Sequence, residues 1–511
     1  MIVDDDPMFR RIVESVLTDA GFHVLCAGDV ESAQTVFSQV DVESLCCVLV
    51  DYHLPSSNGI EMVEWLNREY PTVAAVMVTG SPEHSLLERS LRARVCAFLG
   101  KPLAPGEIRR AVASSATITA QRRAFGEMRH QVEHAGSIQK TELERMLRRG
   151  DVSLDYRFYP RYFSSGDFLA YERLPDGADV FVMSDAAGHD LHASVRSAYF
   201  QGMLCGLLRN GRRLAGAFED CNHALLDQPA GQVFSVSACA LQVDRRAGCL
   251  NAWSYGAPPP AFVDWQGWVR TIGSRSSSPL GWFEDARPTL DRVGIPRGPA
   301  WMWTDGLETL AEYLRVSPFS VAYYLLETPA TTVPDIIAHA GDDVLVARIW
   351  PGASAGSAHP GYSQPLIVDA YGPDLIQNID RLQERWTRSL QLTLPALSSS
   401  IRYDLTLCAR EALLNALKHG CSEADKAEFQ VIYEPSEQLL RVQVSDPGPG
   451  YYFDVEQHAA RDLCDPVEDH RGLMLMHAHA TRISVNRDGA EVRMEFPLHC
   501  DAPEEFQVTT L

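Results

Sequence analysis

The sequence lacks the features of a membrane protein or a nucleic-acid-binding protein. No apolar run reaches the roughly 18 uninterrupted residues of a membrane-spanning helix, and the N-terminus has no basic region followed by an apolar one. The chain holds 45 Lys and Arg against 67 Asp and Glu, which gives a formal net charge of -22. We therefore expect no membrane span, no signal peptide and no nucleic-acid surface, because the excess negative charge repels phosphates.

The spacing of the cysteines excludes further kinds of site. The 12 cysteines are irregularly spaced, Cys46 and Cys47 are adjacent, and no C-x-x-C pair occurs. These residues are expected to be buried, reduced thiols of a cytoplasmic protein, with no zinc site among them. The length of 511 residues suggests about three domains.

Residues 1–112 alternate short apolar segments with amphipathic helices. The expected strands are a very short one before Asp4 and three longer ones at 46–52, 73–80 and 96–102. This pattern predicts a doubly wound α/β sheet, in which ligands gather at the carboxyl ends of the strands. Five polar residues lie at those ends: Asp4, Asp5, Asp51, Thr79 and Lys101.

This first stretch resembles a two-component receiver domain, with Asp51 in VLVDYHLPSSNG and Lys101-Pro102 after the last strand. The resemblance implies that a histidine kinase or phosphotransfer protein phosphorylates Asp51. It also implies a set of magnesium ligands and phosphoryl contacts. The ligands would be Asp4, Asp5, Asp51 and the main-chain carbonyl of His53, and the contacts would be Thr79 and Lys101.

The chemistry of this cluster is reasonable in itself. A carboxylate near other carboxylates and a lysine can attack a phosphoryl donor once magnesium neutralises the cluster. Because the first strand of this fold lies inside the sheet, we also expect the natural chain to begin before Met1.

Residues 113–150 are expected to form a helical connector. Its apolar residues follow three-four spacing before Gly136 and again after it. They are Phe125, Met128, Val132, Ala135, Leu143, Met146 and Leu147. Two interpretations stay open, an amphipathic helix packed on its own domain and the seam of a parallel coiled coil. The second predicts a homodimer whose helix transmits a change of register or rotation.

Residues 151–350 place aspartates at the ends of several apolar strands. The run 180–183 is followed by a glycine turn at 187–188, so Asp185 lies at a strand end. Alone, such an aspartate is typical of a helix cap. The pattern recurs, however, in SSGDF, MWTDGLE and AGDDVLVARI, with Asp167, Asp305, Asp342 and Asp343. Carboxylates suit magnesium or manganese, and two such ions roughly 3.5 to 4 Å apart can hold a water for attack on phosphorus.

The order of these motifs resembles the PPM-type, manganese- or magnesium-dependent serine/threonine phosphatases of the sporulation-II-E-like branch. NAWSYGAPPPAFV at 251–263 and SSPLGW at 277–282 look like two further segments of that family. The resemblance implies a β-sandwich with flanking helices and a two-metal centre in which Asp185 is catalytic. The implied ligands are Asp167, Asp185, the carbonyl of Ala186, Asp305 and Asp342. Asp190 departs from the family glycine and adds bulk and charge beside the metals.

Residues 351–365 are rich in Gly, Ser, Ala and Pro, which indicates a linker before a domain at 366–500 and a tail at 501–511. In that domain, CAREALLNALKHG places Glu411, Asn415 and Lys418 or His419 on one helix face. Such a face is by itself typical of a solvated helix. Further on, the strand in RVQVSDPGPG ends at Asp446.

These segments and HRGLMLM resemble the GHKL ATP-binding fold, an α/β sandwich, and most closely the serine kinases of anti-sigma-factor antagonists. On that resemblance, Asn415 would ligate magnesium on ATP and Glu411 would position or deprotonate the attacking hydroxyl. Asp446 would accept a hydrogen bond from the adenine amino group. The backbone would close round the nucleotide at Gly448, Gly450, Arg471 and Gly472. His470 replaces a glycine of many relatives, which is expected to weaken turnover more than ATP binding.

Together the resemblances imply a multidomain response regulator of bacterial partner switching. Its phosphatase is expected to act on a phosphoserine or phosphothreonine of a STAS-type anti-sigma factor antagonist, its kinase module to reverse this, and phosphorylated Asp51 to select the activity. The alternative is a non-catalytic or half-catalytic protein that sequesters a sigma factor or the antagonist. Asp190 and His470 favour this alternative, whereas the aspartates and the Glu411/Asn415 pair oppose it.

Overall fold

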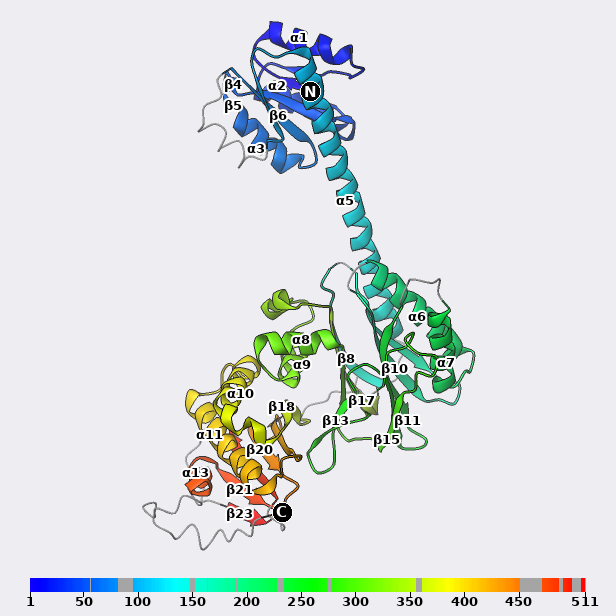
Figure 1. The fold of residues 1–511 in the computed structure, drawn as a ribbon, viewed down its shortest axis with the longest axis vertical. Helices are drawn as coiled ribbons and strands as arrows, with labels where there is room; N and C mark the ends of the chain where they lie inside the picture. Colours follow the sequence, from blue (N-terminus) through cyan, green and yellow to red (C-terminus); the bar gives the residue numbers. More distant parts are fainter. Residues whose placement is uncertain are drawn as a thin grey trace. The chain divides into compact units, whose positions relative to one another are not determined.

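The computed structural model describes residues 1–55, 57–80, 95–147, 152–162, 164–188, 191–227, 234–273, 277–354, 361–450, 471–486, 490–498 and 507–510. It divides into two units, Met1–Glu133 and His134–Leu511 (Figure 1). Asp190 and His470 lie outside the described residues. Across the described ranges, no helix combines the length and the apolar character needed to cross a bilayer. The cysteines in these ranges have free thiols, but the predicted burial is wrong for Cys26, which is exposed.

The first unit is built on a parallel five-stranded sheet. Its strands, in spatial order, are β2 (Cys26–Ala27), β1 (Ile2–Val3), β3 (Cys47–Asp51), β6 (Ala74–Thr79) and β7 (Ala97–Gly100). Alternate residues of β3 point to opposite faces, so each face of the sheet has its own apolar core. Helix α1 (Pro7–Thr18) and the start of α5 (Pro105–Leu147) cover one face, and α2 (Val30–Gln39) and α3 (Gly59–Glu69) cover the other. The doubly wound prediction is confirmed.

Helix α5 runs unbroken through Gly136. Leu143 is 1% exposed and belongs to the core of the second unit, whereas Phe125 is 71% exposed. The side chains of Met128, Val132, Met146 and Leu147 lie outside the described residues. Leu143 therefore packs on its own domain, and the dimer seam stays a prediction.

The second unit begins with two antiparallel sheets. The first is ordered β15 (Thr289–Gly294), β12 (Cys249–Tyr255), β11 (Val236–Asp244), β10 (Asp179–Ala186), β9 (Asp167–Arg173). The second is ordered β14 (Val269–Thr271), β13 (Ala261–Val263), β16 (Ala300–Trp303), β17 (Val344–Ser354), β8 (Val152–Tyr159).

Helices cover both outer faces of this pair of sheets. Leu345 and Ala347 of β17 share a core with the first sheet and with α6 (Leu191–Arg209) and α7 (Leu214–Leu226). Val344 and Val346 point the other way, toward α8 (Asp305–Leu314) and α9 (Pro318–Glu327). The predicted β-sandwich with flanking helices is confirmed (Figure 1).

A six-stranded sheet follows, with one face covered by helices. Its order is β18 (Gln364–Tyr371), β19 (Ala427–Glu434), β20 (Leu439–Ser445), β22 (Glu491–Pro497), β21 (Arg482–Val485), β23 (Gln507–Thr510). Helices α10 (Ile379–Thr393), α11 (Ser399–Asn415) and α13 (Arg471–His479) share its main core. Trp386 of α10, fully buried, stacks on Phe429 of β19 at 4.5 Å between ring centroids. This arrangement is the predicted α/β sandwich.

The opposite face of this sheet packs on the preceding domain of the same unit. Val269 N of β14 donates a hydrogen bond to Gln430 Oε1 at 2.9 Å, and Ile432 belongs to the α8–α9 core. The stretch interpreted as a linker is shorter than 351–365, because β17 continues to Ser354 and β18 begins at Gln364.

Candidate functional site

Two neighbouring strands place a pair of aspartates side by side at one end of the sandwich. Asp167 begins β9, Asp185 is the penultimate residue of β10, and the antiparallel register pairs them directly. Asp167 is 2% exposed, and Asp185 is partly buried. The strand extends past the predicted run 180–183 and ends at Ala186, the predicted carbonyl ligand.

The second sheet brings more carboxylates to the same end. Asp305 begins α8 directly after β16, and Asp342 and Asp343 directly precede β17. Thr304 Oγ1 donates to Asp167 Oδ2 at 2.6 Å and accepts from Leu345 N at 3.2 Å. This hydroxyl joins the two sheets and leaves the other oxygen of Asp167 for a different partner.

The carboxylates of this cluster repel one another. Burial, and then the charge of Asp185, raise the pKa of Asp167 well above its usual value. Burial, and then the charges of Asp305, Asp342 and Asp343, raise the pKa of Asp185 to about 7. All members can ionise together only if positive charge is supplied, which a divalent cation does.

The donor set fits Mn²⁺ or Mg²⁺, because carboxylate and carbonyl oxygens are the ligands these ions prefer. A Cβ at Gly166 would lie 2.5 Å from Ala186 O and 3.3 Å from Asp185 Oδ1, so the glycine of SSGDF leaves these oxygens open. Within the described residues, no three acidic, histidine or cysteine side chains already form a cation cage.

Asp343 anchors the loop before Asp167 to the final strand. Its carboxylate accepts hydrogen bonds from Arg161 N at 2.7 Å, Ser165 Oγ at 2.6 Å and Gly166 N at 3.0 Å. Because these donors already use both of its oxygens, Asp343 is suited to hold the loop. Asp342 Oδ1 accepts a hydrogen bond from Asp343 N at 2.9 Å, and its role as a metal ligand stays a prediction.

Gln139 of α5 holds the same loop from the other side. Its amide donates to Ser165 O at 3.0 Å and Asp167 O at 3.3 Å, and it accepts from Ser165 N at 3.2 Å. Neither Gln139 nor Thr304 was predicted from the sequence. Thr304 could have been predicted, because it directly precedes Asp305 in MWTDGLE. No feature of the sequence around Gln139 sets it apart from the other polar residues of its helix.

A second acidic site lies at the carboxyl edge of the parallel sheet. Asp51 ends β3 and Asp4 follows β1, with 5% and 1% exposed. Lys101 Nζ lies 2.7 Å from Asp4 Oδ2 and 2.8 Å from Asp51 Oδ1. His53 N donates to Asp51 Oδ2 at 2.9 Å. Burial raises the pKa of Asp4, although Lys101 opposes this.

Two more predicted residues border that site. Thr79 ends β6 and is buried, and its carbonyl accepts a hydrogen bond from Lys101 N at 2.8 Å. Asp5 is exposed, unlike Asp4. Burial alone lowers the pKa of Lys101, but its bonds to Asp4 and Asp51 raise it overall, so the lysine stays charged between two carboxylates.

A third site lies where α11 meets α13. Glu411 and Asn415 are four residues apart on α11, and a Cβ at Gly472 would lie 3.2 Å from Glu411 Oε2 and 3.3 Å from Asn415 Nδ2. Arg471 begins α13, and its side chain lies outside the described residues. After Asn415 the helix changes to a π-helical turn, Ala416–Gly420. Lys418 and His419 lie in this turn, and their place on the face of Glu411 and Asn415 stays a prediction.

Asp446 follows β20 beside this turn. Its Oδ1 accepts from Gly448 N at 3.0 Å, and burial raises its pKa while that bond lowers it. A Cβ at Gly420 would lie 2.0 Å from the Asp446 carboxylate, so only glycine lets the two segments meet. Gly420 was missed, although it ends the quoted helix motif. Gly450 has a φ of 76°, which also favours glycine.

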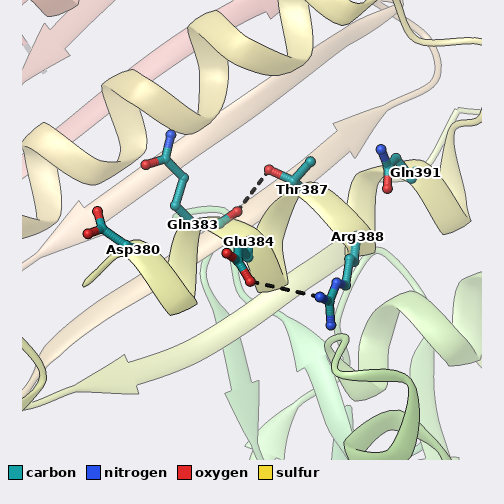
Figure 2. A pocket seen from close by; sticks show the side chains of 6 residues that line it. All are labelled: Asp380, Gln383, Glu384, Thr387, Arg388 and Gln391. Carbon is teal, nitrogen blue, oxygen red and sulfur yellow. Dashed lines mark hydrogen bonds and ion pairs between the residues drawn. The ribbon is translucent and has the colours of Figure 1, made fainter. Parts of the chain in front are cut away.

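An open polar hollow of about 430 Å³ lies along α10, apart from the predicted residues (Figure 2). Asp380, Gln383, Glu384, Thr387, Arg388 and Gln391 line it. Arg388 pairs with Glu384 at 3.8 Å, and Thr387 Oγ1 donates to Gln383 O at 2.8 Å. Its polar groups partly satisfy one another along a single helix, which is typical of a solvated face.

Comparison with protein families identifies three matches. The response regulator receiver domain matches residues 1–113, stage II sporulation protein E (SpoIIE) matches 175–314, and the histidine kinase-like ATPase domain matches 376–496.

Similar curated proteins include the transcriptional regulatory protein AruR of Pseudomonas aeruginosa, 27% identical over 195 residues, covering 34% of this chain and 76% of AruR. The response regulator protein PilR of the same species is 28% identical over 115 residues, covering 22% of this chain and 25% of PilR. The transcriptional activator protein ExaE of Pseudomonas putida is 30% identical over 112 residues, covering 22% of this chain and 52% of ExaE.

Similar solved structures include the RsbU and RsbW domains of Rv1364c from Mycobacterium tuberculosis. That structure is 15% identical with a TM-score of 0.32, and the match covers 68% of this chain and 92% of the other. A receiver domain protein from Methanospirillum hungatei JF-1 is 23% identical with a TM-score of 0.22, covering 24% and 94%.

The repulsion among the carboxylates predicts that Asp185→Asn stabilises the metal-free protein. Folding raises the pKa of Asp185 from 3.8 to about 7, so its ionisation opposes folding fully above pH 7 and not at all below pH 3.8. The variant should unfold at a higher temperature than wild type in EDTA at pH 8, by the equivalent of about 2–4 kcal/mol, and the gain should shrink toward pH 4. Calorimetry at both pH values measures this, and a less stable variant at pH 8 would contradict it.

The hydrogen bonds of Gln139 predict a second effect. Gln139→Leu keeps the side-chain size but removes three hydrogen bonds to the Asp167 loop. The Mn²⁺ affinity should therefore fall by about tenfold, which corresponds to the net free energy of roughly one hydrogen bond. Calorimetric titration with MnCl2 measures it. Lys140→Leu, at the exposed next position of the same helix, is the matched control. Equal Mn²⁺ affinities of Gln139→Leu and Lys140→Leu would show that Gln139 does not support the metal site.

Proposed function

Because the chain is a response regulator with a receiver domain, a SpoIIE domain and a histidine kinase-like ATPase domain, we propose that its receiver controls two opposing activities on one partner protein. The phosphatase removes phosphate from a serine or threonine of a STAS-type anti-sigma factor antagonist, and the kinase module restores it. The observation that carries the proposal is the meeting of carboxylates from both sandwich sheets at one end of the central domain.

In the phosphatase, four aspartates and one carbonyl hold two Mn²⁺ or Mg²⁺ ions. They are Asp167, Asp185, Asp305, Asp342 and Ala186. When bound, these ions lower the pKa of a water and orient it for in-line attack on phosphorus. Thr304 fixes one oxygen of Asp167 through the 2.6 Å hydrogen bond and leaves the other for ligation. Asp343 keeps the loop before Asp167 in place.

In the receiver, Asp51 accepts a phosphoryl group from a histidine kinase or phosphotransfer protein. Asp4, Asp5, Asp51 and the His53 carbonyl hold Mg²⁺. Lys101, now 2.8 Å from Asp51 Oδ1, would contact the new phosphoryl oxygens together with Thr79. Phosphorylation therefore replaces a lysine–carboxylate pair and changes the charge at the edge of the sheet, which makes it a switch.

In the kinase module, Asn415 ligates Mg²⁺ on ATP and Glu411 positions or deprotonates the serine hydroxyl. Asp446 accepts from the adenine amino group, and Gly448, Gly450, Arg471 and Gly472 surround the nucleotide. The approach of Gly472 to Glu411 and Asn415 supports this arrangement. We place the protein in the cytoplasm, and we propose a homodimer through the connector 113–150, where Phe125 of α5 is exposed.

The phosphatase half predicts that Asp185→Ala and Asp305→Ala each lower Mn²⁺-dependent hydrolysis of p-nitrophenyl phosphate by about 100-fold or more, because each removes a metal ligand. Phosphate release with MnCl2 and with EDTA measures this. Asp291→Ala, an exposed aspartate of β15, is the control. Unchanged activity in both ligand variants would refute the assignment.

The kinase half predicts different losses for two neighbouring residues. Asn415→Ala should weaken Mg-ATP binding by about tenfold or more, whereas Glu411→Gln should keep binding but lose phosphoryl transfer to the antagonist. Calorimetry and transfer of the labelled γ-phosphate separate the two effects. A wild-type chain that binds ATP but phosphorylates no antagonist would instead favour the alternative of a half-catalytic, sequestering protein.

A further inference from the structure

Helix α6 exposes apolar side chains next to the acidic centre, and none of the proposed chemistry uses them. Leu191, Val195 and Tyr199 are 40%, 62% and 48% exposed. A spacing of four residues places them on one stripe of the helix, while Ala193 and Phe200 point into the core. The stripe covers about the first two and a half turns of α6, the helix that follows β10 and its Asp185 in the chain.

A rigid turn presents two exposed aromatic rings. Trp282 and Phe283 are 53% and 55% exposed, with ring centroids 6.4 Å apart. Asn222 of α7, 2% exposed, accepts from Gly281 N at 2.8 Å and donates to Phe283 O at 2.9 Å. Gly281 has a φ of 84°, and a Cβ there would lie 2.0 Å from Phe234 O. The backbone is thus fixed on both sides of Trp282, although its ring remains in solvent.

Phe234 connects this turn, the α6 stripe and the acidic centre. Its ring lies 6.4 Å from that of Tyr199, and its carbonyl lies against Gly281. The next residue accepts a hydrogen bond from Ala187 N through its carbonyl at 3.1 Å. Ala187 directly follows the proposed ligands Asp185 and Ala186. Ser235 and the buried Phe234 therefore link the strand end at Asp185 and Ala186 to the Tyr199 ring and the Gly281 turn.

We propose that these five side chains, the aromatic patch of Leu191, Val195, Tyr199, Trp282 and Phe283, dock the folded protein that carries the phosphoserine. This inference rests on the proposed phosphatase function. A phosphoseryl side chain is short, so its own protein must lie against the surface bordering the metal centre whenever the phosphate reaches it. Aromatic side chains held rigidly in solvent are typical anchors of protein interfaces. Arg196, next to Val195 on α6, lies 5.3 Å from the Phe234 ring and suits an acidic rim on that partner.

The test compares a protein substrate with a small ester in the full-length chain. The probes are the STAS-domain protein encoded nearest its gene, phosphorylated on serine, and p-nitrophenyl phosphate, both with MnCl2. Trp282→Ala and Val195→Asp should each lower kcat/KM for the phosphoprotein by roughly tenfold or more, mainly by raising KM. For p-nitrophenyl phosphate the change should stay within about twofold. Trp265→Ala, at a 90% exposed aromatic on the β13–β14 turn, is the control and should affect neither substrate.

Other results would overturn either the docking surface or the proposed substrate. Normal turnover of the phosphoprotein by both variants overturns the docking surface and leaves the proposed function standing. Equal losses on both substrates overturn it as well, and if light scattering also shows a changed molar mass, the patch is a contact between two copies. If wild-type protein hydrolyses p-nitrophenyl phosphate but not the phosphoprotein, the proposed substrate is wrong. The proposed partner of the aromatic patch is then wrong as well.

Discussion

The central constraint in this protein is the repulsion among carboxylates that the sandwich holds at one end. Asp167 and Asp185 are directly paired across β9 and β10, and burial, together with the charges of nearby aspartates, raises the pKa of each. The apolar core between the two sheets fixes the strands and therefore keeps these groups together in spite of the repulsion. A structure that maintains such a cluster is poised for cations, because only positive charge lets every carboxylate ionise there.

Neutral and charged hydrogen bonds around the cluster come from separate parts of the chain. Thr304 reaches Asp167 from the second sheet, Asp343 holds the loop from the final strand, and Gln139 holds it from α5. These hydrogen bonds hold Asp167 and its loop in a fixed orientation. Gln139 is especially informative, since α5 is the same helix that begins in the receiver. The helix that begins in the receiver therefore also carries the side chain that hydrogen-bonds the loop before Asp167.

Much of the fold could be predicted from the sequence, because it depends on local patterns. Alternating strands and helices predicted the doubly wound sheet, and aspartates beside glycines at strand ends predicted which residues the sandwich brings together. Other features depend on contacts between residues far apart in the chain. Thr304 and Gln139 matter only because the fold places them beside Asp167. Gly420 matters because the Asp446 carboxylate lies against it, and the π-helical turn Ala416–Gly420 has no marker in a three-four pattern.

The direct test of this account is to locate the cations. Crystals of the chain soaked in MnCl2 and measured at the manganese absorption edge should show two anomalous peaks roughly 3.5 to 4 Å apart among Asp167, Asp185, Asp305 and Asp342. Crystals of Asp185→Asn should show a clear loss of at least one peak. Wild-type crystals with no peak among these four carboxylates at saturating manganese would contradict the account.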